Sequence, residues 1–209
     1  MGCAFEDQPL YVVFAGINGA GKSTLYRSGL WRKTVGSVAL ERINPDEILR
    51  ERGDDPADAL AQLKAGREAV VRIEACLASR TSFNQETTLS GKSSVNTIKR
   101  AKTLGYRVAM YYVGVDSIEV ARRRIAHRAE LGGHDIAPEL VKRRFERSAE
   151  HMLDAVKLCD EVYLFDNTVM FEHIATVRNG TVEENEAAPV ADWAHALVER
   201  VKERLEMDR

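Results

Sequence analysis

The chain has 209 residues, 44% of them hydrophobic, which is enough to bury one full core, so its length predicts a single α/β domain spanning residues 1–209. A net charge of -2 gives no overall positive field, which argues against a general role in binding nucleic acid or an anionic membrane surface. No apolar run reaches the ~18 residues of a membrane span, and the acidic start resembles no signal peptide, so we expect a cytoplasmic protein.

In chain order, five apolar, β-rich runs alternate with helical patterns, and this alternation predicts a parallel sheet flanked by helices. The runs cover residues 10–15, 38–43, a short stretch near Phe83, 108–115 and 161–165. Between the second and third runs, Asp55 and Pro56 predict the N-cap and first position of a long helix. Its apolar residues at helical spacing are Leu60, Leu63, Val70, Ile73 and Leu77.

The second half of the chain predicts another long helix from Pro138 through Met152. The loop before it, residues 131–135, carries Gly132 and Gly133, which suggest a hinge. After the fifth run, Asn179-Gly180 predicts a hairpin turn within residues 174–182. An amphipathic helix around Trp193, Leu197 and Val201 closes the chain, so we assign residues 170–209 to a C-terminal hairpin and helix.

Directly after the first strand lies a glycine-rich segment that matches G-x-x-x-x-G-K-S/T and leads into a helical run. Such a P-loop curls its backbone N–H groups around phosphates, and a helix N-terminus adds a favourable dipole. Lys22 is predicted to reach the β- and γ-phosphates of ATP, and Ser23 to hold Mg2+. The residues predicted to bind ATP are Gly16, Asn18, Gly19, Ala20, Gly21, Lys22, Ser23 and Thr24.

Other P-loop classes fit the sequence less well than a kinase does. The chain has no N/T-K-x-D motif, which a GTPase uses to recognise its base. Leu89-Ser90-Gly91-Lys92 is similar to the start of an ABC-type signature, but no acidic pair follows it at the end of a strand. We interpret Gly91-Lys92-Ser93 as a helix start. The three cysteines, Cys3, Cys76 and Cys159, lie far apart and favour buried thiols over a zinc site.

Five motifs in order resemble the zeta-toxin family of small-molecule kinases over about residues 9–185. They are the P-loop, Asn44-Pro45-Asp46, Glu86-Thr87-Thr88-Leu89-Ser90-Gly91, Gly132-Gly133-His134-Asp135 and Phe165-Asp166-Asn167. The resemblance implies an adenylate-kinase-like P-loop core that transfers the γ-phosphate of ATP to a nucleotide sugar such as UDP-N-acetylglucosamine. It also implies an antitoxin protein as a partner.

Two acidic residues follow predicted strands, where ligands collect at the carboxyl edge of a parallel sheet. Asp46 is our expected general base, and the alternative is that it only caps the helix over residues 47–51. Glu86 is expected to orient Mg2+ through water or to hold an acceptor hydroxyl, with Thr88 also contacting the acceptor; the alternative is a solvated carboxylate. Asp116 is a rival acid that we interpret as a helix cap, with Glu119 at N3.

Basic residues concentrate in residues 121–147, the expected lid region. Arg124 and Arg128 lie four apart on one helical face, and the resemblance implies that they bind the triphosphate and act in catalysis. We expect the other basic residues there to form a solvated face: Arg122, Arg123, Lys142, Arg143, Arg144 and Arg147. A nucleic-acid patch is less favoured because no aromatic residues interleave with them.

Asn167 follows the last parallel strand, where such kinases often line the adenine pocket. His134 is a candidate contact for phosphate or nucleotide, with a structural or solvated role as the alternative, and we assign no chemistry to His127, His151 or His173. Two alternative functions stay open: a polynucleotide or other metabolite kinase, and a nucleotide-gated binding module without catalysis.

Overall fold

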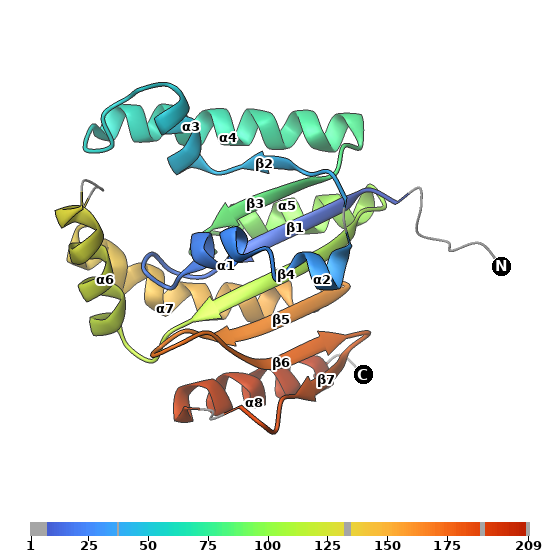
Figure 1. The fold of residues 1–209 in the computed structure, drawn as a ribbon. Coiled ribbons are helices and arrows are strands. Elements are labelled where there is room, and N and C mark those ends of the chain that lie inside the picture. The colour runs from blue at the N-terminus through green and yellow to red at the C-terminus, as the bar shows by residue number, and fades with distance from the viewer. Residues whose placement is uncertain (1–7, 37, 132–134, 189–190, 208–209) are drawn as a thin grey trace.

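A seven-stranded sheet with the order β2-β3-β1-β4-β5-β6-β7 forms the centre of the molecule (Figure 1). The structure, a computed structural model, describes residues 8–36, 38–131, 135–188 and 191–207. Five strands are parallel and two antiparallel strands extend one edge. The strands are β1 (Leu10–Ala15), β2 (Glu41–Ile43), β3 (Phe83–Thr87), β4 (Arg107–Gly114), β5 (Glu161–Asp166), β6 (Glu172–Arg178) and β7 (Thr181–Glu184).

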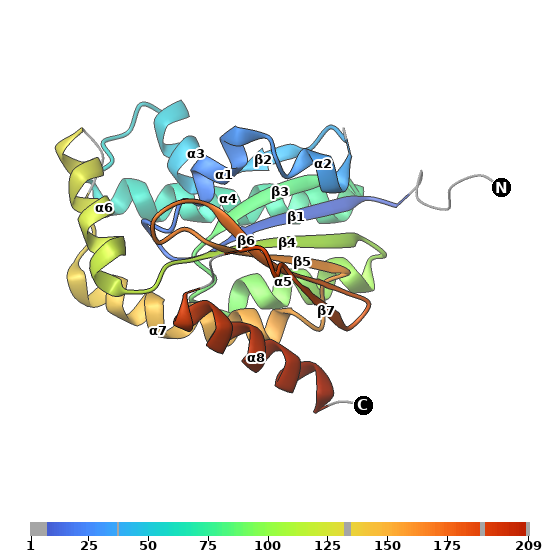
Figure 2. The same ribbon diagram turned by 60° about the horizontal axis from the view of Figure 1, so that its bottom comes forward.

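Helices cover both faces of this sheet, which confirms the predicted P-loop α/β architecture (Figures 1 and 2). They are α1 (Lys22–Ser28), α2 (Arg32–Val35), α3 (Pro45–Glu51), α4 (Ala59–Ser79), α5 (Lys92–Thr103), α6 (Ile118–Glu130), α7 (Pro138–Ala155) and α8 (Asp192–Glu206). None of the helices within the described ranges combines the length and apolar character needed to cross a bilayer.

Strand β1 is buried on both faces, as its unbroken apolar sequence predicts for a central parallel strand. Tyr11 and Val13 belong to the core beneath α4, α5, α7 and α8, whereas Val12 and Phe14 pack with side chains from α1, α2 and α6. Because successive side chains of a strand point to opposite faces, the strand joins both cores. The P-loop therefore starts from the most deeply buried strand of the sheet.

Several predicted elements are confirmed. Helix α7 begins at Pro138, α5 follows Gly91, and α8 spans the predicted C-terminal helix. The hairpin between β6 and β7 turns at Asn179 and Gly180, whose φ angles of 50° and 72° are those that a two-residue hairpin turn requires.

The second predicted strand is shorter than expected, because β2 begins only at Glu41 and Val38 is 39% exposed. The long helix also starts later: Asp58 caps α4 by accepting the Leu60 N–H at 2.8 Å. The predicted cap Asp55 instead accepts the N–H of Ala57, in a turn before the helix. Pro56 therefore lies outside α4.

The predicted buried face of α4 is largely wrong. Leu60, Leu63 and Val70 are each more than half exposed, and only Ile73 and Leu77 of the predicted set are buried. The helix buries mainly a row of small side chains, Ala61, Ala65, Ala69 and Cys76, beside these two. Small residues let α4 approach β2 and α3 closely, which larger leucines would prevent.

Two smaller expectations are corrected as well. Ser117, not Asp116, caps α6, since its hydroxyl accepts the Val120 N–H; Glu119 is then the second helical residue. Cys76 is buried but Cys159 is only partly buried, and Cys3 lies outside the described residues. Across the described part of the chain, no three His, Cys, Asp or Glu residues cluster as metal ligands.

Candidate active site

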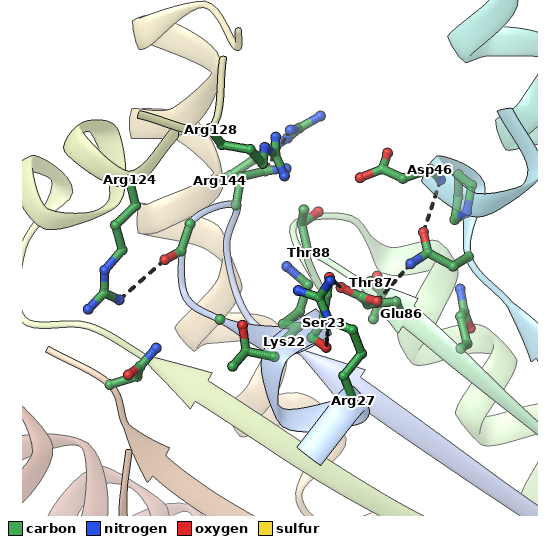
Figure 3. A pocket seen from close by; sticks show the side chains of 18 of the residues that line it. Lys22, Ser23, Arg27, Asp46, Glu86, Thr87, Thr88, Arg124, Arg128 and Arg144 are labelled. Atoms are coloured by element: carbon green, nitrogen blue, oxygen red, sulfur yellow. Dashed lines mark hydrogen bonds between the residues drawn. The ribbon is translucent and has the colours of Figure 1, made fainter. Parts of the chain in front are cut away.

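A cavity of about 770 Å3 opens at the carboxyl edge of the parallel strands (Figure 3). Its walls come from the P-loop and α1, the start of α3, the end of β3, and the helices α4, α5, α6 and α7. Most predicted site residues line it: Asn18, Gly19, Gly21, Lys22, Ser23, Thr24, Asp46, Glu86, Thr88, Arg124, Arg128 and Asn167. The topology thus brings together motifs that lie up to 149 residues apart in the chain, from Asn18 to Asn167.

The P-loop conformation explains its glycines. Gly16 has φ +133°, and a Cβ there would lie 2.1 Å from the carbonyl oxygen of Val113. Gly21 has φ +109°, and its Cβ would lie 2.3 Å from the Asn167 amide nitrogen. Both positions therefore exclude other residues by backbone angle and by space.

Lys22 extends into the cavity from the first turn of α1, yet only 8% of the residue is exposed. Its Nζ donates to the carbonyl oxygen of Ile17 at 2.9 Å. Burial lowers the pKa of Lys22; Arg128 and Arg144 lower it further, while Glu86 and Asp46 raise it. A bound anion would stabilise the charged ammonium, which fits a triphosphate at this position.

Glu86 is held in a fixed position, so its interpretation as a solvated carboxylate is wrong. Only 8% of its side chain is exposed. Ser23 Oγ donates to Glu86 Oε1 at 2.6 Å, and Arg42 and Asn44 donate to Oε2 at 2.6 and 2.7 Å. A hydroxyl and a carboxylate are the hard oxygen groups that Mg2+ prefers when phosphates complete its coordination, so Ser23 and Glu86 fit the implied ion.

Asp46 does not cap α3, which removes the alternative role that its position allowed. Asn44 is the cap, and its Oδ1 accepts the Asp46 N–H at 2.9 Å. Asp46 lies in the first turn of α3, and its carboxylate points into the cavity on the side facing Arg128 and Arg144 (Figure 3). A carboxylate in this position can accept a proton from a hydroxyl group.

Three arginines from α6 and α7 enter the cavity, one more than the sequence predicted. Arg124 donates to the carbonyl oxygens of Gly19 at 3.4 Å and Thr168 at 3.1 Å, and Arg128 lines the cavity. Arg144, which we expected on a solvated face, donates to Asn18 Oδ1 at 2.6 Å. Burial lowers the pKa of Arg124 and of Arg144, and a neighbouring arginine lowers each further.

A signal for Arg144 was present in the sequence. It lies three residues after Val141 and four before Ser148, both buried, so helical periodicity places it on the inner face of α7. Its Nη1 reaches the P-loop from this face. Arg27, also unassigned from the sequence, lines the cavity and donates to the Ser23 carbonyl oxygen at 3.2 Å.

Asn167 braces the P-loop. It is 8% exposed, and its Nδ2 donates to the carbonyl oxygen of Ala20 at 2.7 Å. On the opposite side, Thr88 lines the cavity and its hydroxyl bonds with Ser90 at 2.9 Å. His151 contacts the loop that carries Thr88 and Ser90, since its Nδ1 lies 3.0 Å from the carbonyl oxygen of Leu89. The predicted Gly132, Gly133 and His134 lie outside the described residues.

Known proteins resemble this chain in sequence and in fold. The family model described as Zeta toxin matches residues 3–185. An uncharacterized protein of Haemophilus influenzae is 31% identical over 134 residues, which cover 64% of this chain and 91% of that protein.

Two solved structures share the fold. One, from the PezAT chromosomal toxin-antitoxin system of Streptococcus pneumoniae, has a TM-score of 0.59 and 15% identity, and the match covers 97% of this chain and 88% of that chain. The other, AvrRxo1-ORF1:-ORF2 with ATP, has a TM-score of 0.63 and 15% identity over 96% of this chain and 76% of that chain. At these identities the likeness establishes a common fold.

Proposed function

The chain belongs to the zeta-toxin family, and from this premise we propose that it is an ATP-dependent kinase that transfers the γ-phosphate to a hydroxyl group of a small molecule. The observation that carries the proposal is the convergence of a P-loop lysine, the carboxylate of Asp46 and the arginines of α6 and α7 on one cavity. These are the groups that phosphoryl transfer requires.

Each group has a distinct role in this mechanism. The P-loop N–H groups and Lys22 bind the phosphates of ATP, while Asp46 accepts the proton of the attacking hydroxyl. Arg128 and Arg144 face Asp46 across the cavity, where they stabilise negative charge on the transferred phosphoryl group (Figure 3). Arg124 supports the P-loop at Gly19. When bound beside Ser23 and Glu86, Mg2+ would neutralise phosphate charge.

The acceptor that we propose is a nucleotide sugar such as UDP-N-acetylglucosamine, as the family resemblance implies. The cavity volume lies within the range of ligand pockets, and Thr88, Gln62 and Gln85 provide neutral hydrogen-bonding groups for sugar hydroxyls. We further propose that the reaction occurs in the cytoplasm and that an antitoxin protein regulates it. The toxin-antitoxin system of the S. pneumoniae relative supports this partner.

The proposal is tested by mass spectrometry of nucleotide sugars, free sugars, nucleosides and oligonucleotides incubated with ATP and Mg2+. We expect a mass gain of one phosphate on a nucleotide sugar with the wild-type protein. Asp46→Asn should lower the rate by about 10²–10⁴-fold, the usual contribution of a general base. Asp116→Asn is the matched control, because Asp116 lies outside the cavity.

The outcomes separate the alternatives. Phosphorylation of another acceptor would keep the mechanism and replace the substrate, and an oligonucleotide product would support a polynucleotide kinase. ATP binding without any product would favour a non-catalytic, nucleotide-gated module. Full activity of the Asp46→Asn variant would remove Asp46 as the base.

A further inference from the structure

Both carboxylate oxygens of Glu86 are engaged by side chains of the protein itself. Oε1 accepts the hydroxyl of Ser23, and Oε2 accepts one donor from Arg42 and one from Asn44, with all three distances between 2.6 and 2.7 Å. Few positions around the carboxylate remain for a direct bond to a metal ion. Glu86 therefore has a fixed orientation in which one oxygen points at the P-loop serine.

The register of β2 on β3 creates this arrangement. Arg42 pairs with Asn84, and Ile43 pairs with Gln85. The next residues along the two segments, Asn44 and Glu86, therefore lie side by side. Residues two apart on a strand share a face, which places Arg42, Asn44, Asn84 and Glu86 on the same side of the sheet.

Arg42 is built into this face by contacts on every side of its guanidinium. Nη1 donates to Asn84 Oδ1 at 2.9 Å, Nε and Nη2 donate to the two oxygens of Glu47, and the group lies 3.7 Å over the ring of Tyr26. Only 14% of the Arg42 side chain is exposed. A planar donor fork is needed to satisfy three partners at once, so lysine cannot replace it.

Asn44 has two functions in one side chain. Its Oδ1 caps α3 at the N–H of Asp46, and its Nδ2 donates to Glu86. The same amide thus connects the start of the helix that carries Asp46 with the carboxylate that faces Ser23.

We propose that Glu86 acts on Mg2+ through Ser23 and that Arg42 and Asn44 are positioning residues for this contact. A serine hydroxyl that gives its proton to a carboxylate keeps its lone pairs free for a cation, and Glu86 takes that proton in a hydrogen bond. Arg42 and Asn44 fix Glu86 so that the Ser23 lone pairs face the phosphate site. This inference rests on the proposed binding of ATP and Mg2+, and it assigns the Ser23 hydroxyl as the group through which Glu86 orients the ion.

A double-mutant cycle with Ser23→Ala separates the two roles. If Glu86 bound Mg2+ directly, Arg42→Lys would lower the affinity for the ion whether or not the Ser23 hydroxyl is present. If Glu86 acts through the hydroxyl that it accepts from Ser23, Arg42→Lys has no further effect once Ser23 is replaced, and a further loss in that background would overturn the proposal.

The experiment measures ATP affinity by isothermal titration calorimetry, once with EDTA and once with excess Mg2+. The ratio of the two affinities is the gain due to the metal. Arg42→Lys keeps the charge but loses the planar fork, and Asn44→Ser keeps a helix cap but loses the donor to Glu86. Arg100→Lys is the matched control, because Arg100 makes a forked contact with Glu74 on the exposed surface and does not line the cavity.

We expect each of the first two variants to lower the gain due to Mg2+ by about tenfold, as outer-shell changes do, with the EDTA affinity and the control unchanged. An unchanged or larger gain would overturn the proposal, as would an equal loss of affinity in EDTA and in Mg2+. Thermal melts verify folding, and Asn44→Ser carries the test alone if Arg42→Lys does not fold. The calorimetry needs no phosphoryl acceptor. Its result therefore stands even if the protein phosphorylates none of the acceptors in the mass-spectrometry panel.

Discussion

Gly114, the last residue of β4, lies directly against the indole of Trp193 on α8. A Cβ at Gly114 would be 2.3 Å from Trp193 Cη2 and 2.7 Å from Cζ3. No positive φ requires glycine at this position, so space alone excludes a side chain. Gly114→Ala must therefore displace the ring or the helix that carries it. Overpacking of this kind lowers the free energy of unfolding by about 1–3 kcal/mol.

Gly66, within α4, provides the matched control. A Cβ there would meet nothing within 4 Å. Replacing a glycine inside a helix by alanine raises the free energy of unfolding by about 0.5–1 kcal/mol. The same added methyl group should therefore have opposite effects at the two positions.

Thermal unfolding followed by circular dichroism measures the difference. For a chain of this size, 1 kcal/mol shifts Tm by about 2–4 °C, so we expect Gly114→Ala to lower Tm by about 2–12 °C and Gly66→Ala to raise it by about 1–4 °C. Adding Trp193→Leu to Gly114→Ala should make the loss smaller than the sum of the two single changes. A Gly114→Ala protein that melts at or above the wild-type temperature would refute the packing of α8 on β4.

Three further predictions concern the site and the sheet edge. Arg144→Gln should weaken ATP binding by about 5–30-fold in calorimetry, the ~1–2 kcal/mol gained when the guanidinium exchanges the Asn18 amide oxygen for a phosphate oxygen, whereas the exposed neighbour Arg143→Gln should not; equal losses would contradict a specific contact. Gly21→Ala should abolish ATP binding without changing the circular dichroism spectrum, because its Cβ would collide with Asn167; binding at wild-type affinity would contradict the loop geometry. Burial lowers the pKa of His173, so the folded state favours the neutral ring and stability should fall as pH drops below about 6.5. Urea unfolding at pH 7.5 and 5.5 should show a smaller loss for His173→Gln, and an equal loss would exclude His173 as the cause.

Local patterns predicted the parts of the molecule that depend on neighbouring residues. The P-loop follows from Gly16 to Ser23 and its position between a strand and a helix, and the hairpin follows from Asn179 and Gly180. In both cases the backbone angles demand particular residue types, so the sequence carries the information directly. The parallel pairing of β1 to β5 follows in the same way from the alternation of strands and helices, whereas their order in the sheet comes from the structure.

The features that sequence did not predict depend on contacts across the fold. Helix α4 presents an alanine face and a leucine face at similar helical spacing, and only its close approach to α3 and β2 decides which is buried. Arg42 is a charged residue on a short edge strand, a position usually exposed to solvent. Its contacts with Asn84 and Glu86 depend on the register with β3, which no local pattern specifies.

Three successive P-loop residues are each contacted by a different distant element. Arg144 on α7 donates to Asn18, Arg124 on α6 to Gly19, and Asn167 after β5 to Ala20. The contact from Arg144 ends on a neutral amide oxygen, which is worth about 0.5–1.5 kcal/mol, whereas a hydrogen bond to a charged phosphate is worth about 1.5–3 kcal/mol. Exchange of the Asn18 amide for a phosphate oxygen therefore favours the bound state by about 1–2 kcal/mol. By this argument, Arg144 supports the P-loop without nucleotide and gains a stronger partner when a triphosphate binds.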